Sequence, residues 1–426
     1  MTEPFANSSR RWTAVVLVVA AAVWLCYGGA KHALASHYGA SSNSKEWPRA
    51  AEIEPSSAEN WYRLGRYRQL DFDHPDLKLA ISYYRRAVEL DPPSPFYKLD
   101  LATALEMAGD NAEAEKYFRA AQANYPISGE VSWRYGNFLL RQQRLPEAYS
   151  EIHRAVLVDP KLLPSAVSRA WRSNPDVQVL LDQILPDTPD GGWDALDLLT
   201  QAQQTAAALA VWNHFIAKKP SLRQVSLFAF LDLLVAQDKF EEGGAAWHQA
   251  LALQGAPANP SAGGPLLYDG GFESELSGGG FGWRQQDVGG AAFDFDTAEK
   301  HSGARSARIT FDGSQNLSYG QLYQYVLVQP RTRYKFQGFL RTDQISTDSG
   351  VRFEISDPRR QQDLDLLTPN ETGTQAWTLE EVEFATGAQT HLIQITLRRV
   401  PSTHLENQLS GTVWADDLSL APAGSK

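Results

Sequence analysis

The sequence of 426 residues contains very little cysteine and no histidine pair at the spacing of metal ligands. Its one cysteine, Cys26, lies in an apolar N-terminal run, and a single thiol cannot close an intramolecular disulfide. The nine histidines are scattered along the chain, so neither a zinc site nor a metalloenzyme is predicted. The net charge is −11 and there is no basic patch, which argues against nucleic acid as a partner.

Sequence signatures of catalysis are missing as well. The chain has no G-x-S-x-G elbow, no P-loop and no dinucleotide-binding fingerprint. Its carboxylates follow the pattern of solvated strand faces and loops, not that of the paired acid and base of a glycosidase. Examples are Asp363, Asp365, Glu380, Glu381 and Glu383. The sequence therefore predicts a protein that is not an enzyme.

The length and composition are those of a folded protein with two or three domains. Hydrophobic residues make up 43% and charged residues 21%, so large cores can form and wholesale disorder is not expected. Aromatic residues reach 11%, including 12 tryptophans, a content that suits both the packing of helical repeats and the stacking of sugar rings.

The N-terminal segment 12–30 is apolar and contains no charge, and Arg10 and Arg11 precede it. About 19 residues at 1.5 Å each come close to spanning a hydrocarbon core of about 30 Å. Because positive charge stays on the cytoplasmic side, residues 1–11 are predicted to be a cytoplasmic tail and 12–30 an inner-membrane anchor. The bulk of the chain is then periplasmic or extracellular. The alternative is a signal peptide cleaved near Ala33 and Ala35, and both readings export the chain.

A repeat of 34 residues follows the apolar segment. Four columns of residues recur at this spacing: a small residue, a bulky residue, a second small residue and a proline. They are Ala80, Ala114 and Ala148; Tyr84, Phe118 and Ile152; Ala87, Ala121 and Ala155; and Pro92, Pro126 and Pro160. Small residues let two helices approach closely, bulky residues fill the space between them, and proline ends the second helix.

These columns resemble the tetratricopeptide repeat. The W-x2-L-G opening of that family is present here as Trp61, Leu64 and Gly65. The resemblance weakens toward the end of the array, and the segment 185–194 interrupts it. It implies stacked helix pairs over residues 45–255 with a groove that binds a protein partner.

Residues 256–265 are rich in proline and glycine and are predicted to be a linker, after which the hydrophobic period changes. Three later segments, 333–343, 350–356 and 391–399, alternate apolar and polar residues, as strands with one buried face do. Several such strands over about 160 residues predict an antiparallel β-sandwich. The expected inward residues are Tyr334, Phe336, Gly338, Leu340, Val351, Phe353, Ile355, Ile393, Ile395 and Leu397.

Five segments in one order resemble the jelly-roll carbohydrate-binding modules of the family-4 and family-9 type. They are YDGGFE, HSGARSARITFD, QLYQYVLVQPRTRYKFQGFLRT, WTLEEVEF and GTVWADDLSLAP. The resemblance covers residues 266–423 and implies a jelly roll that binds a polysaccharide. In similar modules a structural calcium ion lies near the first and last strands, and the matching carboxylates here are Glu273 and Asp417. The alternative is that Glu273 and the pair Asp416 and Asp417 make turn hydrogen bonds.

A glycan site needs flat aromatic surfaces for pyranose rings and fixed polar groups for hydroxyls. Tyr319, Tyr323 and Tyr325 are expected on one side of a strand, and polar side chains on neighbouring strands are expected to form one charged face. The candidate ligand-binding residues are Trp283, Tyr323, Tyr325, Phe339, Arg341, Arg352, Glu354, Gln394 and Arg398. An ordinary solvated sheet face would show the same polar residues, so packing or solvation is the alternative for each.

Three functions fit this combination. The first is an exported, membrane-anchored adaptor that recruits a protein partner and binds a glycan in cell-envelope or exopolysaccharide assembly, the assembly role resting on analogy of fold. The second is a pure protein-interaction scaffold. An exposed Trp283, or Tyr323 beside Arg341, would argue against it. The third is an accessory protein of a polysaccharide-degrading system, which a mature N-terminus near Ser36 would favour.

Overall fold

The computed structural model describes residues 8–41, 43–71, 75–255 and 266–424, so the predicted linker 256–265 and most of the predicted tail lie outside the described residues. The chain divides into two compact units, Met1–Asp187 and Thr188–Lys426. Within the described residues, fourteen α-helices precede ten strands in two antiparallel sheets. The predicted order of an apolar helix, helical repeats and an antiparallel sandwich is confirmed.

Helix α1 (Ser8–Gly39) is longer than the predicted apolar run. Its segment Arg11–Gly39 is long and apolar enough to cross a membrane, a test that an N-terminal signal sequence also passes. The last turns of α1 pack on the helices that follow. Ala35 is 0% exposed, and a Cβ at Gly39 would lie 3.2 Å from the Asn60 Oδ1 atom. The Nδ1 atom of His32 lies 3.1 Å from the carboxylate of Glu54 at the end of α2.

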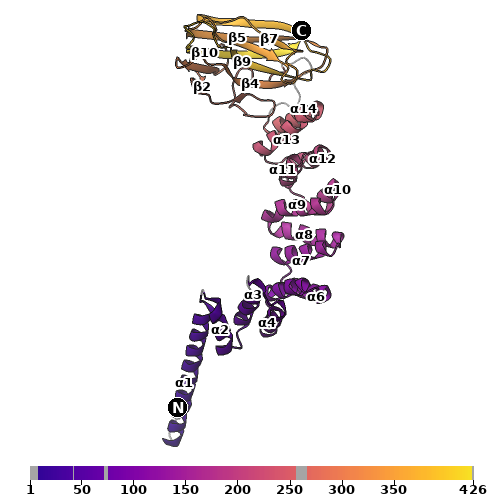
Figure 1. The fold of residues 1–426 in the computed structure, drawn as a ribbon, viewed down its shortest axis with the longest axis vertical. Helices are drawn as coiled ribbons and strands as arrows, with labels where there is room; N and C mark the ends of the chain where they lie inside the picture. Colours follow the sequence, from indigo (N-terminus) through magenta and orange to yellow (C-terminus); the bar gives the residue numbers. More distant parts are fainter. Residues whose placement is uncertain (1–7, 42, 72–74, 256–265, 425–426) are drawn as a thin grey trace, which may run out of the picture. The chain divides into compact units, whose positions relative to one another are not determined.

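Helix pairs follow α1 in the first unit, and Figure 1 shows α3 to α8 as successive pairs. The helices are α2 (Trp47–Ile53), α3 (Ala58–Leu70), α4 (Leu77–Leu90), α5 (Pro95–Met107), α6 (Asn111–Asn124), α7 (Gly129–Arg141), α8 (Leu145–Val158), α9 (Leu163–Ser173) and the short α10 (Val177–Val179). Side-chain oxygens cap the first turns of α3, α4, α6 and α7, which fixes where these helices begin. The capping residues are Ser57, Asp76, Asp110 and Ser128.

The repeat columns form the core of these pairs. All nine alanine, aromatic and isoleucine positions of the three periodic columns are buried. Steric hindrance explains why the W-x2-L-G motif has a glycine, because a Cβ at Gly65 would lie 2.6 Å from the ring of Tyr84. At Gly136 a Cβ would lie 2.9 Å from Ile152. The prediction that small residues let paired helices approach closely is confirmed.

The second unit begins with four more helices, and its boundary falls within the predicted interruption 185–194. They are α11 (Trp193–Gln201), α12 (Thr205–Ile216), α13 (Gln224–Ala236) and α14 (Phe240–Leu253). Buried aromatic rings fill the space between α11, α12 and α13: Trp193 meets Trp212 and Phe215 edge-on, and Trp212 also contacts Phe230.

The remaining residues form a sandwich of two five-stranded sheets. Sheet A has the order β1 (Arg284–Gln285), β4 (Tyr319–Leu327), β9 (Leu392–Arg399), β6 (Arg352–Ser356) and β7 (Asp365–Leu367). Sheet B has the order β2 (Ala291–Asp296), β3 (Ser306–Asp312), β10 (Ser410–Pro422), β5 (Arg333–Ile345) and β8 (Gly373–Ala385). All ten residues expected to point inward are buried, so the alternation is confirmed.

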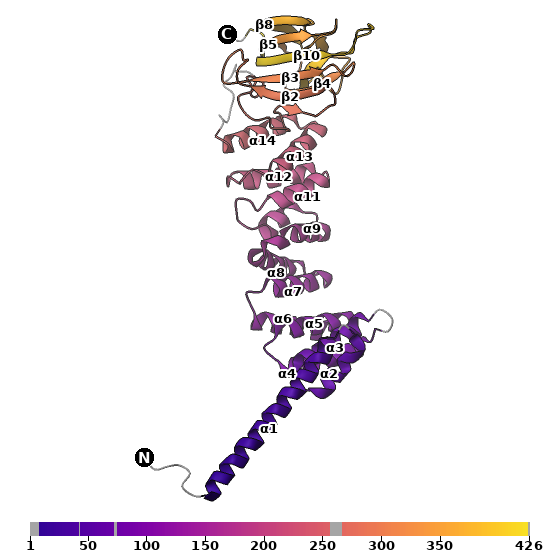
Figure 2. The ribbon, with the colours of Figure 1, turned by 90° about the vertical axis from the view of Figure 1, so that its left-hand side faces the viewer.

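Within the second unit, α13 and α14 pack directly against the sandwich, as Figure 2 shows. A Cβ at Gly279 would lie 2.3 Å from the ring of Phe228 on α13, and one at Gly244 would lie 2.8 Å from Leu327 at the end of β4. On α14, the ring of Phe240 stacks on that of His391 with centroids 5.2 Å apart. The last helix pair is therefore continuous with the sandwich and covers one end of the strands of sheet A.

Candidate functional site

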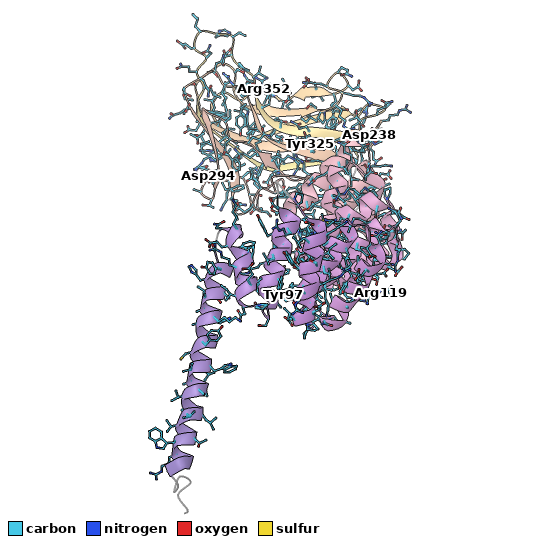
Figure 3. All side chains as sticks on the ribbon, turned by 60° about the horizontal axis from the view of Figure 1, so that its bottom comes forward. Tyr97, Arg119, Asp238, Asp294, Tyr325 and Arg352 are labelled. Atoms are coloured by element: carbon cyan, nitrogen blue, oxygen red, sulfur yellow. The ribbon has the colours of Figure 1, made fainter. Side chains whose placement is uncertain are left out.

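Six of the nine candidate glycan-binding residues lie together on the outer face of sheet A. Neighbouring residues of these strands, such as Leu322, Ile395 and Phe353, point into the core, so alternation turns the candidates outward. The six come from three adjacent strands: Tyr323 and Tyr325 from β4, Gln394 and Arg398 from β9, and Arg352 and Glu354 from β6. We call this surface the sheet A face; Figure 3 labels Tyr325 and Arg352 on it.

The strand register arranges the sheet A face in rows across the strands. One row runs Arg284, Tyr323, Thr396, Glu354, and the next runs Tyr325, Gln394, Ser356. In a third row Arg398 stands directly opposite Arg352. The face therefore offers aromatic rings at the β1 and β4 side, amide and hydroxyl groups in the middle, and guanidinium groups at one end of the strands.

The aromatic part of the sheet A face consists of two tyrosines. The rings of Tyr323 and Tyr325 meet at 69° with centroids 5.5 Å apart. The guanidinium carbon of Arg284 lies 5.1 Å from the centre of the Tyr325 ring, so one face of that ring is covered. Burial raises the pKa of the Tyr325 hydroxyl, which therefore stays a neutral hydrogen-bond donor.

Helix α13 holds Arg284 in that position. An Nη atom of Arg284 donates hydrogen bonds of 3.0 Å to the Asp232 carboxylate on α13 and to the Gly280 carbonyl. The helical pair thus forms a side wall of the sheet A face next to Tyr325. Sequence reasoning missed Arg284 and Asp232. Strand β1 has only two residues and shows no alternation, and nothing local in α13 indicates a contact 52 residues away.

A cleft of about 450 Å³ lies where α14 meets the loops at the end of sheet A. Arg359 forms an ion pair with Asp238, and its guanidinium carbon lies 5.1 Å from the centre of the Phe240 ring. Figure 3 labels Asp238 at this junction. The other residues that line the cleft carry charges of both signs and form no recognisable binding or catalytic centre. They include Lys239, Glu241, Glu242, Asp357 and Arg360.

The charges of the sheet A face are incompletely paired. The Nε atom of Arg398 lies 3.8 Å from Glu354, and its Nη1 atom donates to the Tyr319 carbonyl at 3.0 Å. Burial raises the pKa of Glu354, and the Arg398 charge opposes that rise. Burial lowers the pKa of Arg352, which has no ion pair or side-chain hydrogen bond within the described part of the chain. The Arg352 guanidinium is therefore available to a ligand.

Two candidates, Phe339 and Arg341, lie on the opposite side of the sandwich, so the prediction of one continuous polar face is wrong. Both belong to β5, which pairs with β8 and β10 in sheet B. The ring of Phe339 stacks on that of His301 with centroids 3.6 Å apart. The Nε atom of Arg341 lies 3.2 Å from the Glu299 carboxylate. These contacts occupy both residues within sheet B and its loops.

Two further aromatic residues belong to the core. Trp283 is 2% exposed, packs against Phe272, and donates its indole N–H to the Asp269 carbonyl at 3.0 Å. Tyr319 is also buried, because an irregular register between Tyr319 and Leu322 turns it away from the side that Tyr323 occupies. The expectation that Tyr319 shares a face with the other tyrosines is therefore wrong, and Trp283 cannot reach a surface ligand as it stands.

The carboxylates matched to a calcium site lie around the loop between β2 and β3. The Ala304 N–H donates to both oxygens of Glu273, at 2.9 and 3.1 Å. The Nδ1 atom of His301 lies 2.6 Å from one Asp417 oxygen, and the Ser302 hydroxyl donates to the other at 2.8 Å. N–H and O–H groups thus occupy the oxygens that a calcium ion needs, and the described residues contain no cluster of three metal-ligating side chains. In this arrangement the donor set does not fit calcium.

The fold and site define a class of protein: a helical-repeat array joined to an antiparallel β-sandwich with an aromatic and cationic face. No protein-family model matches the chain, and no curated protein matches it.

Solved structures of two kinds are similar to parts of the chain. A xylan-binding domain of Paenibacillus barcinonensis is 14% identical, with 39% of this chain and 98% of that domain covered and a TM-score of 0.27. The module TmCBM61, solved with β-1,4-galactotriose, is 17% identical, with 37% and 98% covered and a TM-score of 0.27. PilF of Pseudomonas aeruginosa is 20% identical, with 46% and 90% covered and a TM-score of 0.24.

Proposed function

We propose that the protein is an exported, membrane-anchored adaptor that binds a glycan on the sheet A face and a protein partner on its helical repeats. The observation that carries the proposal is the convergence of six candidate residues from three adjacent strands on one face of the sandwich. The proposed setting is cell-envelope or exopolysaccharide assembly, and the proposed activity is binding without catalysis.

The chemistry of the sheet A face supports a glycan. The tyrosine rings supply the flat apolar surface that the C–H side of a pyranose needs. The Gln394 side chain, whose amide donates to the buried Thr396 hydroxyl at 2.8 Å, places a fixed amide group beside the rings. The wall formed by α13 excludes water from one side of Tyr325, and hydrogen bonds strengthen where water is excluded.

The helical repeats support a protein partner. The first helices of three successive pairs are joined by polar contacts: the Tyr62 hydroxyl donates to Asp100 at 2.7 Å, and Arg134 donates to the other Asp100 oxygen at 2.7 Å. Burial, and then the hydrogen bond to Asp100, raise the pKa of Tyr62 well above its usual value, so the hydroxyl remains a donor. Such a row of fixed polar groups along stacked helices is suited to an extended polypeptide.

The packing of α1 supports a retained anchor. A signal peptidase would cut beside Ala35, which is fully buried. Gly39 lies against Asn60, and the Gly39 carbonyl accepts a hydrogen bond from Arg63. Removal of residues 1–35 would take away the buried Ala35 and the contact of His32 with Glu54. We therefore propose a single-pass inner-membrane protein with its N-terminus in the cytoplasm and its repeats and sandwich on the other side.

The test of glycan binding uses the full chain in detergent on an immobilised polysaccharide panel that includes envelope polysaccharides. We expect binding that Tyr323→Ala weakens roughly tenfold, because one stacked ring is worth on the order of 1 kcal/mol or more. Phe339→Ala, on the opposite face, is the matched control and leaves binding unchanged. Loss of binding in the Phe339 variant alone would move the site to sheet B and contradict the proposal.

A second candidate function is a scaffold that binds only proteins. Two observations favour it: Trp283 is buried, and Tyr323 and Arg341 lie on opposite faces. The same panel separates the two candidates. A well-folded full-length protein that binds no polysaccharide would establish the scaffold, and cross-linking to proteins through residues 45–255 would then identify its partners.

A further inference from the structure

We infer that the glycan bound by the sheet A face carries carboxylate groups, and that Arg352 and Arg398 form the subsite for one of them. This inference rests on the proposed function and names the class of its ligand. It comes from the arginine side chains of this face and from the lack of a partner for Arg352.

The cross-strand register places two positive charges directly against each other. Arg352 on β6 and Arg398 on β9 are Cα partners, and like charges in that position destabilise a sheet. Glu354 is two residues along β6 and approaches only Arg398, at 3.8 Å. The next acid on this side, Asp365 at the sheet edge, stands opposite Ser356 and accepts a hydrogen bond from Gln361. The paired guanidinium groups therefore lack one negative charge.

Buried donors without acceptors mark the same face. Arg284, Arg352 and Arg398 each have an Nε atom that is shielded from solvent and makes no hydrogen bond within the described residues. Arg341 on sheet B has such an Nε atom as well, but it lies 3.2 Å from the Glu299 carboxylate, whereas Arg352 has no acid beside it in the described part of the chain. A polar group in this state costs free energy unless a partner reaches it. The two oxygens of a carboxylate accept two parallel hydrogen bonds, one from the Nε group and one from an Nη group of the same guanidinium. A carboxylate ligand would therefore satisfy such a donor.

Three cations on the outer face of sheet B differ from Arg352, because each of them has an acidic partner. On sheet B, Arg308 donates to Asp294 at 2.8 Å and to Asp296 at 3.1 Å. Lys335 lies 2.9 Å from Glu381, and Arg341 has Glu299. Each of these cations has an acid of its own chain, whereas Arg352 has none. The difference points to an external anion at the sheet A face.

The neighbours of the arginine pair favour a sugar acid over an acidic peptide. Thr396 lies between Tyr323 and Glu354 in the adjoining row, and Gln394 is opposite Tyr325. The Gln394 amide and the phenol rings of Tyr323 and Tyr325 match the hydroxyls and the C–H face of a pyranose. A polyglutamate chain offers neither hydroxyls nor a C–H ring face.

The test measures binding of the full chain in detergent to three polysaccharides that carry uronic acid carboxylates, namely polygalacturonate, polymannuronate and hyaluronate. Each is compared with its carboxyl-reduced form. Two neutral polysaccharides, xylan and galactan, and one acidic polypeptide, polyglutamate, complete the panel. We expect one acid form to bind at least about tenfold more tightly than its reduced form, because charge-assisted hydrogen bonds are lost on reduction. Added salt weakens the binding of the acid form and leaves the binding of the reduced form unchanged.

Variants assign that preference to residues. Arg352→Gln removes the preference for the acid form, and Arg352→Lys, which keeps the charge and loses the planar fork, restores part of it. Arg308→Gln removes the same charge from sheet B and is the matched control, which retains the preference. An equal loss in both glutamine variants would assign the effect to net charge and overturn the inference.

The outcomes separate this inference from the proposed function. Binding of neutral glycans with no preference for any acid form overturns the carboxylate subsite and leaves glycan binding standing. Polyglutamate binding as tight as that of the best uronic acid polysaccharide also overturns it, in favour of an acidic polypeptide. Absence of binding to every polysaccharide overturns both.

Discussion

Substitution of the repeat glycine Gly65 by alanine sets two physical effects against each other. In a helix interior alanine is more favourable than glycine by about 0.8–1.0 kcal/mol, so helix propensity alone predicts a more stable α3. The structure places the new Cβ 2.6 Å from the Tyr84 ring. That ring is fully buried, and its hydroxyl donates to Gln69 at 2.7 Å, so it has little room to move.

Overpacking of this kind costs about 1–3 kcal/mol, and a contact below 3 Å with an aromatic ring belongs at the upper end. The net expectation for Gly65→Ala is a loss of about 2 kcal/mol in local stability. Gly136→Ala, where the nearest contact is 2.9 Å to an isoleucine, is expected to lose less. Gly243→Ala in α14, with no contact under 3.6 Å, is expected to gain stability.

Hydrogen exchange of the α3 and α4 amides for Gly65→Ala, and of the α14 amides for Gly243→Ala, is the suitable assay, because a chain of two units need not unfold in one step. A loss of about 2 kcal/mol accelerates exchange through local opening roughly thirtyfold. Slower exchange in Gly65→Ala, or faster exchange in Gly243→Ala, would refute the argument that close helix approach outweighs helix propensity at the repeat glycine.

Three further predictions concern the acids of the second unit and the anchor. Burial, together with the neighbouring Glu371 carboxyl group, raises the pKa of Glu380 from 4.5 to about 7. The folded state therefore keeps a proton that the unfolded state releases, and stability falls as pH rises from 4.5 to about 7. Glu380→Gln flattens this dependence in thermal unfolding; an unchanged slope would exclude Glu380 as its source. Asp232→Asn leaves the fold intact but weakens glycan binding about two- to fivefold by releasing Arg284 from α13, as expected for an exposed ion pair; an unchanged dissociation constant would remove α13 from the site. The intact mass of protein extracted from membranes includes residues 1–35, and a mature N-terminus at Ser36 would instead favour an exported protein of a degrading system.

The sequence predicted the elements of the sandwich better than their assembly. Alternation is a local property, so it identified the inward residues of β5, β6 and β9 without knowing their neighbours. Phe339 and Tyr323 stand in equally good alternating patterns, yet β5 pairs with β8 and β10, whereas β4 pairs with β1 and β9. A strand joins one sheet or the other through pairing with strands that are far away in the sequence. The hydrophobic periodicity of a strand does not indicate these pairings.

Irregular backbone explains the other differences. Trp283 lies in a loop where no periodicity indicates its direction, and it fills the core beside Phe272. Tyr319 belongs to an alternating stretch, but the register shift before Leu322 reverses its side. In the repeats the prediction of the core was accurate, because the period of 34 residues repeats one local contact three times and the columns give its members directly.

The docking of α1 on the first repeat affects how an anchored protein explores its surroundings. A domain on a flexible tether samples a volume set by the length of that tether. Here α1 continues without interruption to Gly39, and buried contacts at Ala35 and Gly39 join it to α2 and α3. In the anchored form proposed above, the tilt of α1 in the bilayer therefore fixes the direction in which the first helix pair leaves the surface. Bilayer thickness becomes a determinant of which partners those helices meet.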